Sequence, residues 1–356
     1  MTETHPYLSI VTVSRNDDHG GNLLQRMQLF IDSLYDQCNR YQIETELIIV
    51  EWNPPVDKKG LQEVLSWPQE QYVTTRIITV PREIHNRFKH ADQMPVFQMI
   101  GKNVGIRRAH GVFILATNID ILFSEELMRY LSTKQLKAGN HYRVDRVDVA
   151  SPVLNEHLKT ELFSSCRENR IRVNKQFGTY EYRDFRDAIP VFFKHRKDFV
   201  FRLKIEQDHG YPLIHSNACG DFTLMAKKNW IDLGGYPELQ MYSFHLDSIF
   251  LVLAHYLGIQ EVYLKPPLEI YHIEHSSGSG WTPGTGEKKL WERLDINGIA
   301  YLSWDDLMQY SSELRETGDP GKTTIGRNDP TWGLMEFQLP EAVINTPPLS
   351  SARTPD

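Results

Sequence analysis

Val112–Asp120 reads VFILATNID, an apolar run that ends in an amide and a carboxylate. Its aromatic and β-branched residues are typical of a buried strand. The stretches Leu8–Ser14 (LSIVTVS), Glu46–Trp52 (ELIIVEW) and Thr75–Pro81 (TRIITVP) have the same character. Because helical patterns separate these strands, we expect an α/β fold with an open, doubly wound, mostly parallel sheet. Ligands bind such sheets beyond the carboxyl ends of the strands.

Helical patterns occupy the segments that follow each of these strands. Apolar side chains recur at intervals of three and four residues from Leu23 to Cys38, which defines one face of a helix. We expect further helices near residues 59–66, 95–109 and 124–137. The first 150 residues therefore read as a series of strand and helix units.

The composition excludes several classes of protein. The chain has 356 residues with 39 basic and 46 acidic side chains, a formal net charge of −7. Proteins whose main partner is nucleic acid usually carry the opposite sign, so we expect no nucleic-acid partner. The cysteines, Cys38, Cys166 and Cys219, are far apart and form no CxxC pair. This pattern predicts a reducing compartment and disfavours a disulfide framework or a zinc ribbon.

The sequence has no pattern typical of secretion or of a membrane span. No basic segment with a long apolar run precedes the first strand, so we expect no signal peptide. The most apolar later stretch, Ile249–Leu257, has about half the length that a bilayer requires. We therefore expect a cytoplasmic protein, for which peripheral membrane contact stays open.

Residues 155–215 interrupt the regular pattern. They are dense in Arg, Lys, Phe and Tyr and keep no clean period. One interpretation is a surface excursion with aromatic anchors, and the other is a loop-rich segment that binds an acceptor or forms a lid. Regular patterns then resume, with strands expected at residues 221–227, 261–264 and 269–272 and a helix at 246–257.

Asp120 is the first candidate for chemistry, because Asn118-Ile119-Asp120 ends the fourth strand. A carboxylate at the carboxyl end of a central strand can hold a divalent cation against a diphosphate. The alternative is an ordinary aspartate that caps a turn at the end of a strand.

A second candidate is Tyr271-His272-Ile273-Glu274-His275, which leads into a loop rich in Gly and Ser. Imidazoles are frequent metal ligands, and such a loop offers backbone donors to phosphate. The HxxH spacing differs from the HExxH of zinc hydrolases, so a hydrolytic zinc site is disfavoured. With Asp120, a histidine here would form an oxygen and nitrogen shell suited to Mn²⁺ or Mg²⁺. The alternative is a pair of structural or surface histidines.

Asp247 opens the helix at residues 246–257, whose neighbouring positions are apolar. A carboxylate at that place can act as a general base. The alternative is an aspartate that is favoured there by the helix dipole.

In chain order these motifs resemble the family 2-like glycosyltransferases of the GT-A fold. The resemblance covers about residues 7–275 and depends on the collinear set rather than on one motif. The residues that carry it are Ser9–Asn16, Glu51, Gly101–Gly105 with Arg107, Ala109 and Gly111, Asn118–Asp120, Gly220–Phe222, Gly234–Tyr236 and His245–Asp247.

The resemblance implies a metal-dependent transfer of a sugar from a nucleotide sugar, most simply a UDP-sugar, to a hydroxyl acceptor in glycan or polysaccharide biosynthesis. It implies Mn²⁺ or Mg²⁺ at Asp120 with His272 or His275, and Asp247 as the base of an inverting enzyme. It implies nucleotide-sugar binding at Thr12, Ser14, Arg15, Glu51, Asn103, Arg107, Asn118 and Asp221. Two positions depart from the family pattern: Asn118 replaces the first acid of DxD, and Leu246 replaces the acid before Asp247.

The resemblance also implies a division of the chain. The GT-A domain would span residues 1–317, with a Rossmann-like nucleotide-sugar-binding half at 7–150 and an acceptor and metal half at 151–317. In the insertion at 155–215, we expect Tyr180, Tyr182, Phe185 and Phe192 to face the acceptor. We expect residues 318–356 to form a partly disordered extension. Within that extension we expect an apolar patch to dock back on the domain, formed by Trp332, Leu334, Met335 and Phe337.

Two other functions stay open at this point. One is a retaining transferase with the same donor site, in which Asp247 positions the acceptor. The other is a catalytically inactive, sugar-binding scaffold. The acceptor would be a glycan, a lipid-linked sugar or a small molecule. A dinucleotide-dependent oxidoreductase is disfavoured, because the loop Arg15–Gly21 lacks GxGxxG.

Overall fold

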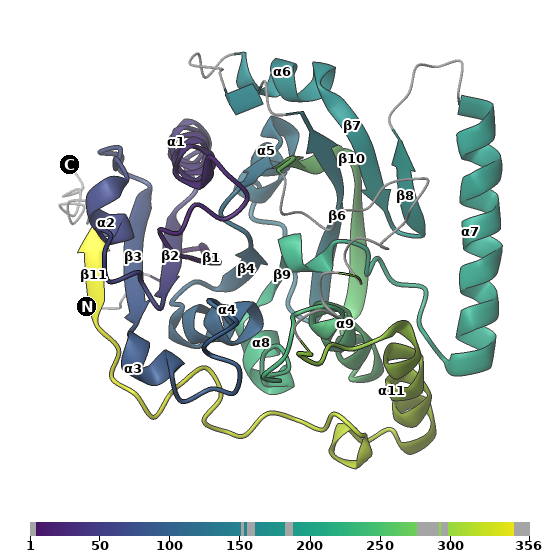
Figure 1. Ribbon diagram of the computed structural model, residues 1–356. Helices are drawn as coiled ribbons and strands as arrows, with labels where there is room; N and C mark the ends of the chain where they lie inside the picture. The colour runs from purple at the N-terminus through teal and green to yellow at the C-terminus, as the bar shows by residue number, and fades with distance from the viewer. Residues whose placement is uncertain are drawn as a thin grey trace, which may run out of the picture.

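The computed structural model describes residues 5–150, 153–154, 161–181, 188–275, 292 and 298–344. These residues form a single eleven-stranded sheet with helices on both faces (Figure 1). The strands are β1 (Leu8–Ser14), β2 (Thr45–Trp52), β3 (Val73–Val80), β4 (Phe113–Thr117), β5 (Ile121–Phe123), β6 (Asn140–Val149), β7 (Arg170–Lys175), β8 (Gly178–Glu181), β9 (Phe222–Ala226), β10 (Gln260–Ile273) and β11 (Glu341–Ile344). The α-helices are α1 (Leu23–Tyr41), α2 (Leu61–Val64), α3 (Arg82–His85), α4 (Gln98–Arg108), α5 (Glu125–Ser132), α6 (Leu162–Glu168), α7 (Ala188–His209), α8 (Lys227–Leu233), α9 (Leu246–Tyr256) and α11 (Trp304–Thr317). The 3-10 turns η3 (Cys219–Asp221) and η4 (Pro320–Lys322) also lie among the described residues.

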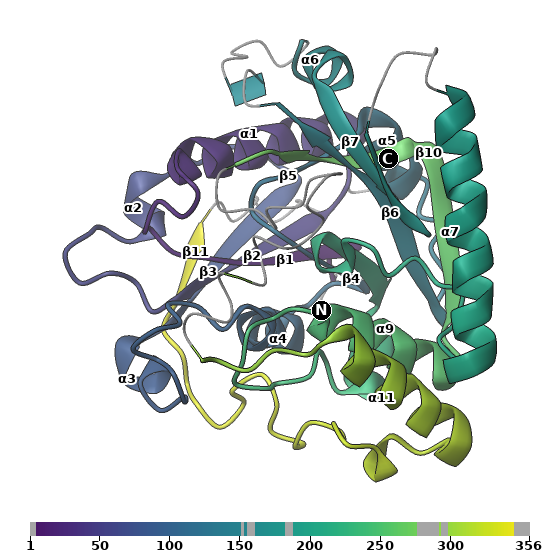
Figure 2. The ribbon, with the colours of Figure 1, turned by 45° about the vertical axis from the view of Figure 1, so that its right-hand side comes forward.

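The N-terminal half of the sheet has the predicted parallel arrangement. Strands β3, β2, β1 and β4 are neighbours in that order, and every pair among them is parallel. Side chains of β1 alternate between two cores: Ile10 packs on the α1 side and Val11 on the α4 side. Figure 2 shows α1 and α4 on opposite faces of these strands. The α/β fold class is therefore confirmed.

The second half of the sheet is mixed in direction. Strand β9 is antiparallel to β4 and to β6, and β10 is parallel to β6. Strand β6 was not expected, because its sequence NHYRVDRVDV contains four charged side chains, Arg143, Asp145, Arg146 and Asp148. Residues 260–273 form the single strand β10, with an irregularity between Leu264 and Glu269, where the sequence predicted two separate strands.

The insertion at residues 155–215 is more regular than expected. It contains helix α6, the hairpin β7–β8 and the 22-residue helix α7, so the expectation of a loop-rich segment is wrong over these parts. Tyr180 is buried and donates a hydrogen bond of 2.8 Å to Asp198 of α7, which ties the helix to the hairpin. Tyr182, Phe185 and the side chain of Phe192 lie outside the described residues.

Residues 318–344 run back along the domain as a C-terminal arm. Trp332 and Leu334 are buried and Phe337 packs against the same core, so the predicted docking is confirmed for these three side chains. Met335 is 46% exposed and does not take part in this docking. The arm ends in β11, which pairs antiparallel with β3 (Figure 1). Residues 345–356 lie outside the described part of the chain.

We searched the described residues for a helix with the length and apolar character needed to cross a bilayer, and we found none.

Candidate active site

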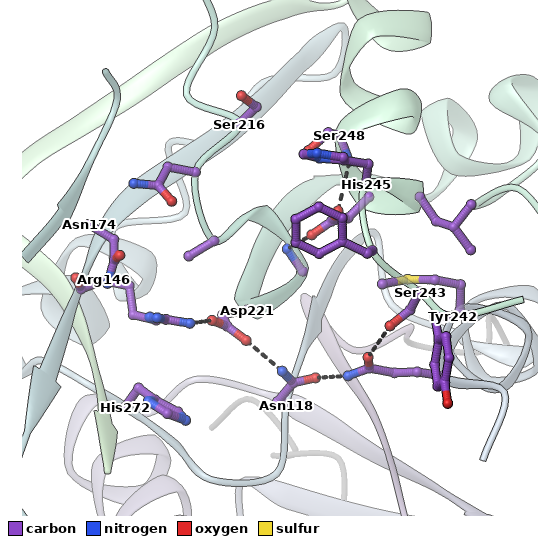
Figure 3. Close-up of a pocket in the computed structure, with 18 of the residues that line it drawn as sticks. Asn118, Arg146, Asn174, Ser216, Asp221, Tyr242, Ser243, His245, Ser248 and His272 are labelled. Carbon is purple, nitrogen blue, oxygen red and sulfur yellow. Dashed lines mark hydrogen bonds and ion pairs between the residues drawn. The ribbon is translucent and has the colours of Figure 1, made fainter. Parts of the chain in front are cut away.

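A cavity of about 1280 Å³ opens at the carboxyl ends of β1 and β4. The β7–β8 hairpin, α7 and the start of α9 line its other side. Figure 3 shows part of its lining. The residues predicted from the sequence that line this cavity are Ser14, Arg15, Asn118, Asp120, Asp221, Asp247, His272 and His275.

Asp120 and the two histidines come together as predicted from the order of the motifs. Asp120 follows β4, His272 lies on β10 and His275 just after it. One ligand atom from each lies within 4.8 Å of the other two, which fits a single cation. The Nδ1 atom of His275 is buried with no hydrogen-bond partner among the described residues. Burial lowers the pKa of His275 to about 4, against the opposing effect of Asp120, so the neutral ring is favoured. Neutral imidazole is the form that binds metal ions.

His272 is oriented by a buried carboxylate. Its Nδ1 lies 2.9 Å from Asp148 Oδ1, and Asp148 is inaccessible to solvent. Asp148 also accepts from Arg172 and Asn174. Although burial raises the pKa of Asp148, Arg146 and His272 outweigh that effect and hold it well below its usual range. Burial lowers the pKa of His272, but the hydrogen bond with Asp148 outweighs it and the net shift is upward. Asp148 orients the ring through Nδ1, so Nε2 is the atom that can bind a ligand once the ring is neutral.

A row of hydrogen bonds crosses the floor of the cavity (Figure 3). Gln98 donates to Asn118 at 2.8 Å, Asn118 donates to Asp221, and Arg146 forms an ion pair with the same carboxylate. Burial raises the pKa of Asp221, but Arg146 reverses this effect and the net shift is downward. Asn118 therefore holds Asp221 by donating from its amide nitrogen. An acid at position 118 could form a hydrogen bond with Asp221 only if one of the two carboxyl groups carried a proton.

Asp247 is held by backbone amides at the start of α9. Its Oδ2 accepts a hydrogen bond of 2.6 Å from the N–H of Gly220, and its Oδ1 accepts from the N–H of Ser248 at 2.9 Å. The buried Lys102 donates to the carbonyl oxygen of the same Gly220 at 2.6 Å. Burial lowers the pKa of Lys102 to about 8. Asp247 faces the cavity and is rigidly positioned, as a base requires.

Arg26 of α1 was not predicted as a site residue. Its side chain is 1% exposed and forms an ion pair with Asp120. A signal for it does exist in the sequence, because Arg26 stands three residues after Leu23 on the apolar face of that helix. A charge on a buried helix face requires a partner, and here the partner is the candidate metal ligand.

Thr12 and Glu51 lie near the cavity but do not line it. Glu51 of β2 is the register partner of Ser14 of β1, so the two side chains lie next to each other on the same face of the sheet, near the carboxyl ends of the strands. Glu51 accepts a hydrogen bond of 2.8 Å from the N–H of Leu61, and burial raises its pKa. Thr12 is fully buried and lies two residues before Ser14 on the same face of β1.

Asn103 and Arg107 lie further along α4 than the residues that line the cavity, and neither is part of its lining. Asn103 is fully buried and donates to the carbonyl oxygen of Tyr236 at 2.8 Å. The guanidinium of Arg107 stacks 4.8 Å from the ring centroid of Trp332 in the C-terminal arm. The structure does not bring these two residues to the other predicted site residues.

No protein-family model matches the chain, and no curated protein matches it in sequence. Among solved structures, the chain is similar to the mannosyltransferase PcManGT of Pyrobaculum calidifontis in complex with GDP-Man and Mn²⁺. That match has a TM-score of 0.40 and 10% identity and covers 89% of this chain and 72% of the other. S. aureus TarS 1–349 matches with a TM-score of 0.42 and 11% identity over 88% of this chain and 71% of the other. S. aureus TarS matches with a TM-score of 0.39 and 12% identity over 87% and 43%. These values describe a distant likeness.

Proposed function

We propose that this chain is a metal-dependent glycosyltransferase of glycan or polysaccharide biosynthesis. It would transfer a sugar from a nucleotide sugar, most simply a UDP-sugar, to a hydroxyl acceptor with inversion. The observation that carries the proposal is that Asp120, His272 and His275 share one cavity with Asp247. A cation site and a positioned carboxylate in one cavity are the two elements that this displacement needs.

The donor would bind across the carboxyl ends of β1, β2 and β4, in the half formed by residues 7–150. Ser14 and Arg15 line the cavity there, with Glu51 behind them. Mn²⁺ or Mg²⁺ held by Asp120 with His272 and His275 would supply positive charge against the leaving diphosphate.

The acceptor would bind on the side of α9, within the half formed by residues 151–317. His245 and Trp304 line the cavity near the start of α9, with ring centroids 5.9 Å apart. Aromatic rings offer an apolar face to sugars. In the transfer step Asp247 takes the hydroxyl proton while the acceptor oxygen bonds to the anomeric carbon and the bond to the diphosphate breaks. Two backbone amides hold the Asp247 carboxylate in place, so little reorganisation is needed.

A second candidate is a metal-independent transferase, and the contact between Arg26 and Asp120 favours it. The guanidinium already neutralises the carboxylate that would bind the cation. In that case Arg26 itself would supply positive charge near the diphosphate.

The test measures hydrolysis of UDP-, GDP- and dTDP-sugars by the purified chain, with Mn²⁺ and with EDTA, since transferases often release donor sugar to water. We expect turnover of one nucleotide class that requires Mn²⁺, and a rise in melting temperature with the same nucleotide. Equal turnover in EDTA would select the metal-independent candidate. Nucleotide binding without turnover, even with a panel of acceptors, would select the inactive scaffold. The absence of both nucleotide binding and turnover would contradict the proposal.

A further inference from the structure

Helix α7 stands at one side of the molecule, beside β8 and α11 (Figures 1 and 2). One side of the helix faces the body of the protein. Arg202 and Ile205 are buried on that side, and Arg202 lies 4.6 Å from the ring centroid of Tyr211. Asp198 bonds to Tyr180 on the same side. The orientation of the helix is therefore fixed by these contacts.

The opposite side carries a stripe of exposed side chains, which we call the outer stripe. It consists of Phe193, Lys197, Val200 and Lys204. Their spacing of four, three and four residues places them on one face of the helix. Phe193 is 56% exposed and Val200 is 57% exposed. Arg196 is also exposed, next to the stripe. The outer stripe thus alternates large apolar and basic side chains toward solvent.

Over residues 193–204, the charge of this face is opposite to that of the chain as a whole. The exposed residues from 193 to 204 include no acid, because the one acid of that segment, Asp198, is turned inward to Tyr180. The chain as a whole has a net charge of −7. Four of the ten exposed large hydrophobic side chains among the described residues lie on this helix, namely Phe193, Phe199, Val200 and Phe201. Basic and apolar residues are thus concentrated together on α7.

We propose that the outer stripe of α7 docks the protein on an anionic phospholipid surface. A helix that lies in a bilayer interface buries aromatic and aliphatic residues among the acyl chains and places lysines at anionic headgroups. A soluble polyanion would be recognised by the lysines alone, without a role for Phe193 and Val200. The presence of both kinds of side chain on one face favours the bilayer.

The position of α7 connects this surface with the cavity. Phe201 and Arg202 of the same helix line the cavity. A docked helix would therefore hold the cavity near the bilayer, where a lipid-linked acceptor would be presented if the proposed transfer is correct. Docking itself does not depend on the transferase activity, and vesicle binding is measured without any nucleotide sugar.

The experiment is co-sedimentation of the full chain with vesicles of phosphatidylcholine alone and with vesicles that also contain the anionic lipid phosphatidylglycerol. We expect binding to the anionic vesicles only, weakening as salt is raised. Each basic residue near such a surface strengthens partitioning about fivefold. Lys197→Glu with Lys204→Glu should therefore weaken binding at least 25-fold, the product of two fivefold losses. Phe193→Ser with Val200→Ser should also weaken it, with a salt dependence like that of the unaltered protein.

The matched control is Lys89→Glu with Lys228→Glu, which makes the same change of charge on exposed lysines after α3 and on α8. This control should keep its binding to within about twofold. All variants should keep the far-UV circular dichroism and the donor hydrolysis of the unaltered chain. Absence of vesicle binding at low salt, or equal losses in the control, would overturn the proposal.

Loss of a concentration-dependent dimer in the stripe variants would identify a second copy as the occupant. Binding to heparin that is unaffected by the Phe193 and Val200 changes, without vesicle binding, would identify a soluble polyanion. Either result would overturn docking on lipid.

Discussion

Lys102 donates a hydrogen bond of 2.6 Å from its buried ammonium to the carbonyl oxygen of Gly220. The N–H of Gly220 in turn donates to Asp247 Oδ2 at 2.6 Å. A lysine in the interior of α4 thereby holds, through the backbone of the single residue Gly220, the carboxylate that we propose as the base. Among the described residues, the hydrogen bond of the Lys102 side chain goes to Gly220, and Lys102 does not line the cavity. We therefore infer a positioning role for Lys102.

Replacement of Lys102 by Met should lower kcat and leave the donor KM almost unchanged. The substitution removes the donor to Gly220 while it keeps the volume of the side chain, so Asp247 loses its fixed position. A misplacement of about 1 Å at a reacting group can cost about 100-fold in rate. Steady-state kinetics with varied donor provide the measurement, and a fall in donor affinity with normal kcat would contradict the positioning role.

The buried ammonium also predicts how stability depends on pH. Burial lowers the pKa of Lys102 from 10.5 to about 8. Below pH 8 both the folded and unfolded states carry the proton, so the cost of burying the charge is fully present. Between pH 8 and 10.5 only the unfolded state keeps the proton, so stability rises with pH. Urea unfolding should show a gain of about 2 kcal/mol from pH 7.5 to 9.5 relative to Lys102→Met. An identical pH dependence in both proteins would contradict this.

Substitution of Asp120 by Asn should weaken Mn²⁺ binding strongly, because it removes the one carboxylate of the proposed site. Because the proposed site uses both rings, His272→Ala and His275→Ala should each weaken Mn²⁺ binding as well. Isothermal titration with Mn²⁺ measures these affinities, and His209→Ala, an exposed histidine at the end of α7, is the control. Equal and small effects of both histidine changes would exclude a metal role for them.

Replacement of Asp247 by Asn should lower kcat by about 10² to 10⁴, the usual loss for a general base. The amide keeps the shape of the side chain and can still accept from Gly220, so donor affinity should survive. The anomeric configuration of the product, read by NMR, completes the test. Retention of configuration, or near-normal turnover of the variant, would move the assignment to a retaining enzyme in which Asp247 positions the acceptor.

Removal of the Arg107 side chain should affect stability without affecting the donor. Arg107 stacks on Trp332 and donates to Pro330 in the C-terminal arm. A cation–π contact at a partly exposed site contributes about 1 kcal/mol. Arg107→Ala should therefore lower the free energy of unfolding by about that amount and leave the nucleotide affinity unchanged. A selective loss of donor affinity would return Arg107 to the binding site implied by the family resemblance.

The sequence predicts the parallel half of the sheet well. Strands such as Leu8–Ser14 are buried on both faces, so a continuous apolar run in the sequence is enough to identify them. Strand β6 was missed for the opposite reason. Its Arg146 and Asp148 pair with each other and also with residues far from them in the sequence, Asp221 and Arg172. The sequence of one strand does not show which residues of other elements will pair with its charged side chains.

The site was predictable where a rule of topology applies. Asp120 and His272 end strands at the same edge of the sheet, so their proximity follows from the strand order. Asn103 and Arg107 lie on a helix, and which turns of the helix reach the cavity depends on packing. Gly101 and Gly105 allow α4 to approach Val13 and Val11 closely, and this approach turns Asn103 toward Tyr236 instead.

The C-terminal arm has a consequence for the solubility of shortened forms of the protein. Strand β11 covers the edge of β3, and Arg76 of β3 holds it through Glu341 at 2.6 Å. A chain cut after residue 317 would keep every residue of the cavity, but β3 would become an open edge. Exposed edges pair with strands of other molecules. Such a truncated protein should aggregate although the proposed catalytic residues remain present, because the arm would no longer protect the edge of β3 against intermolecular pairing.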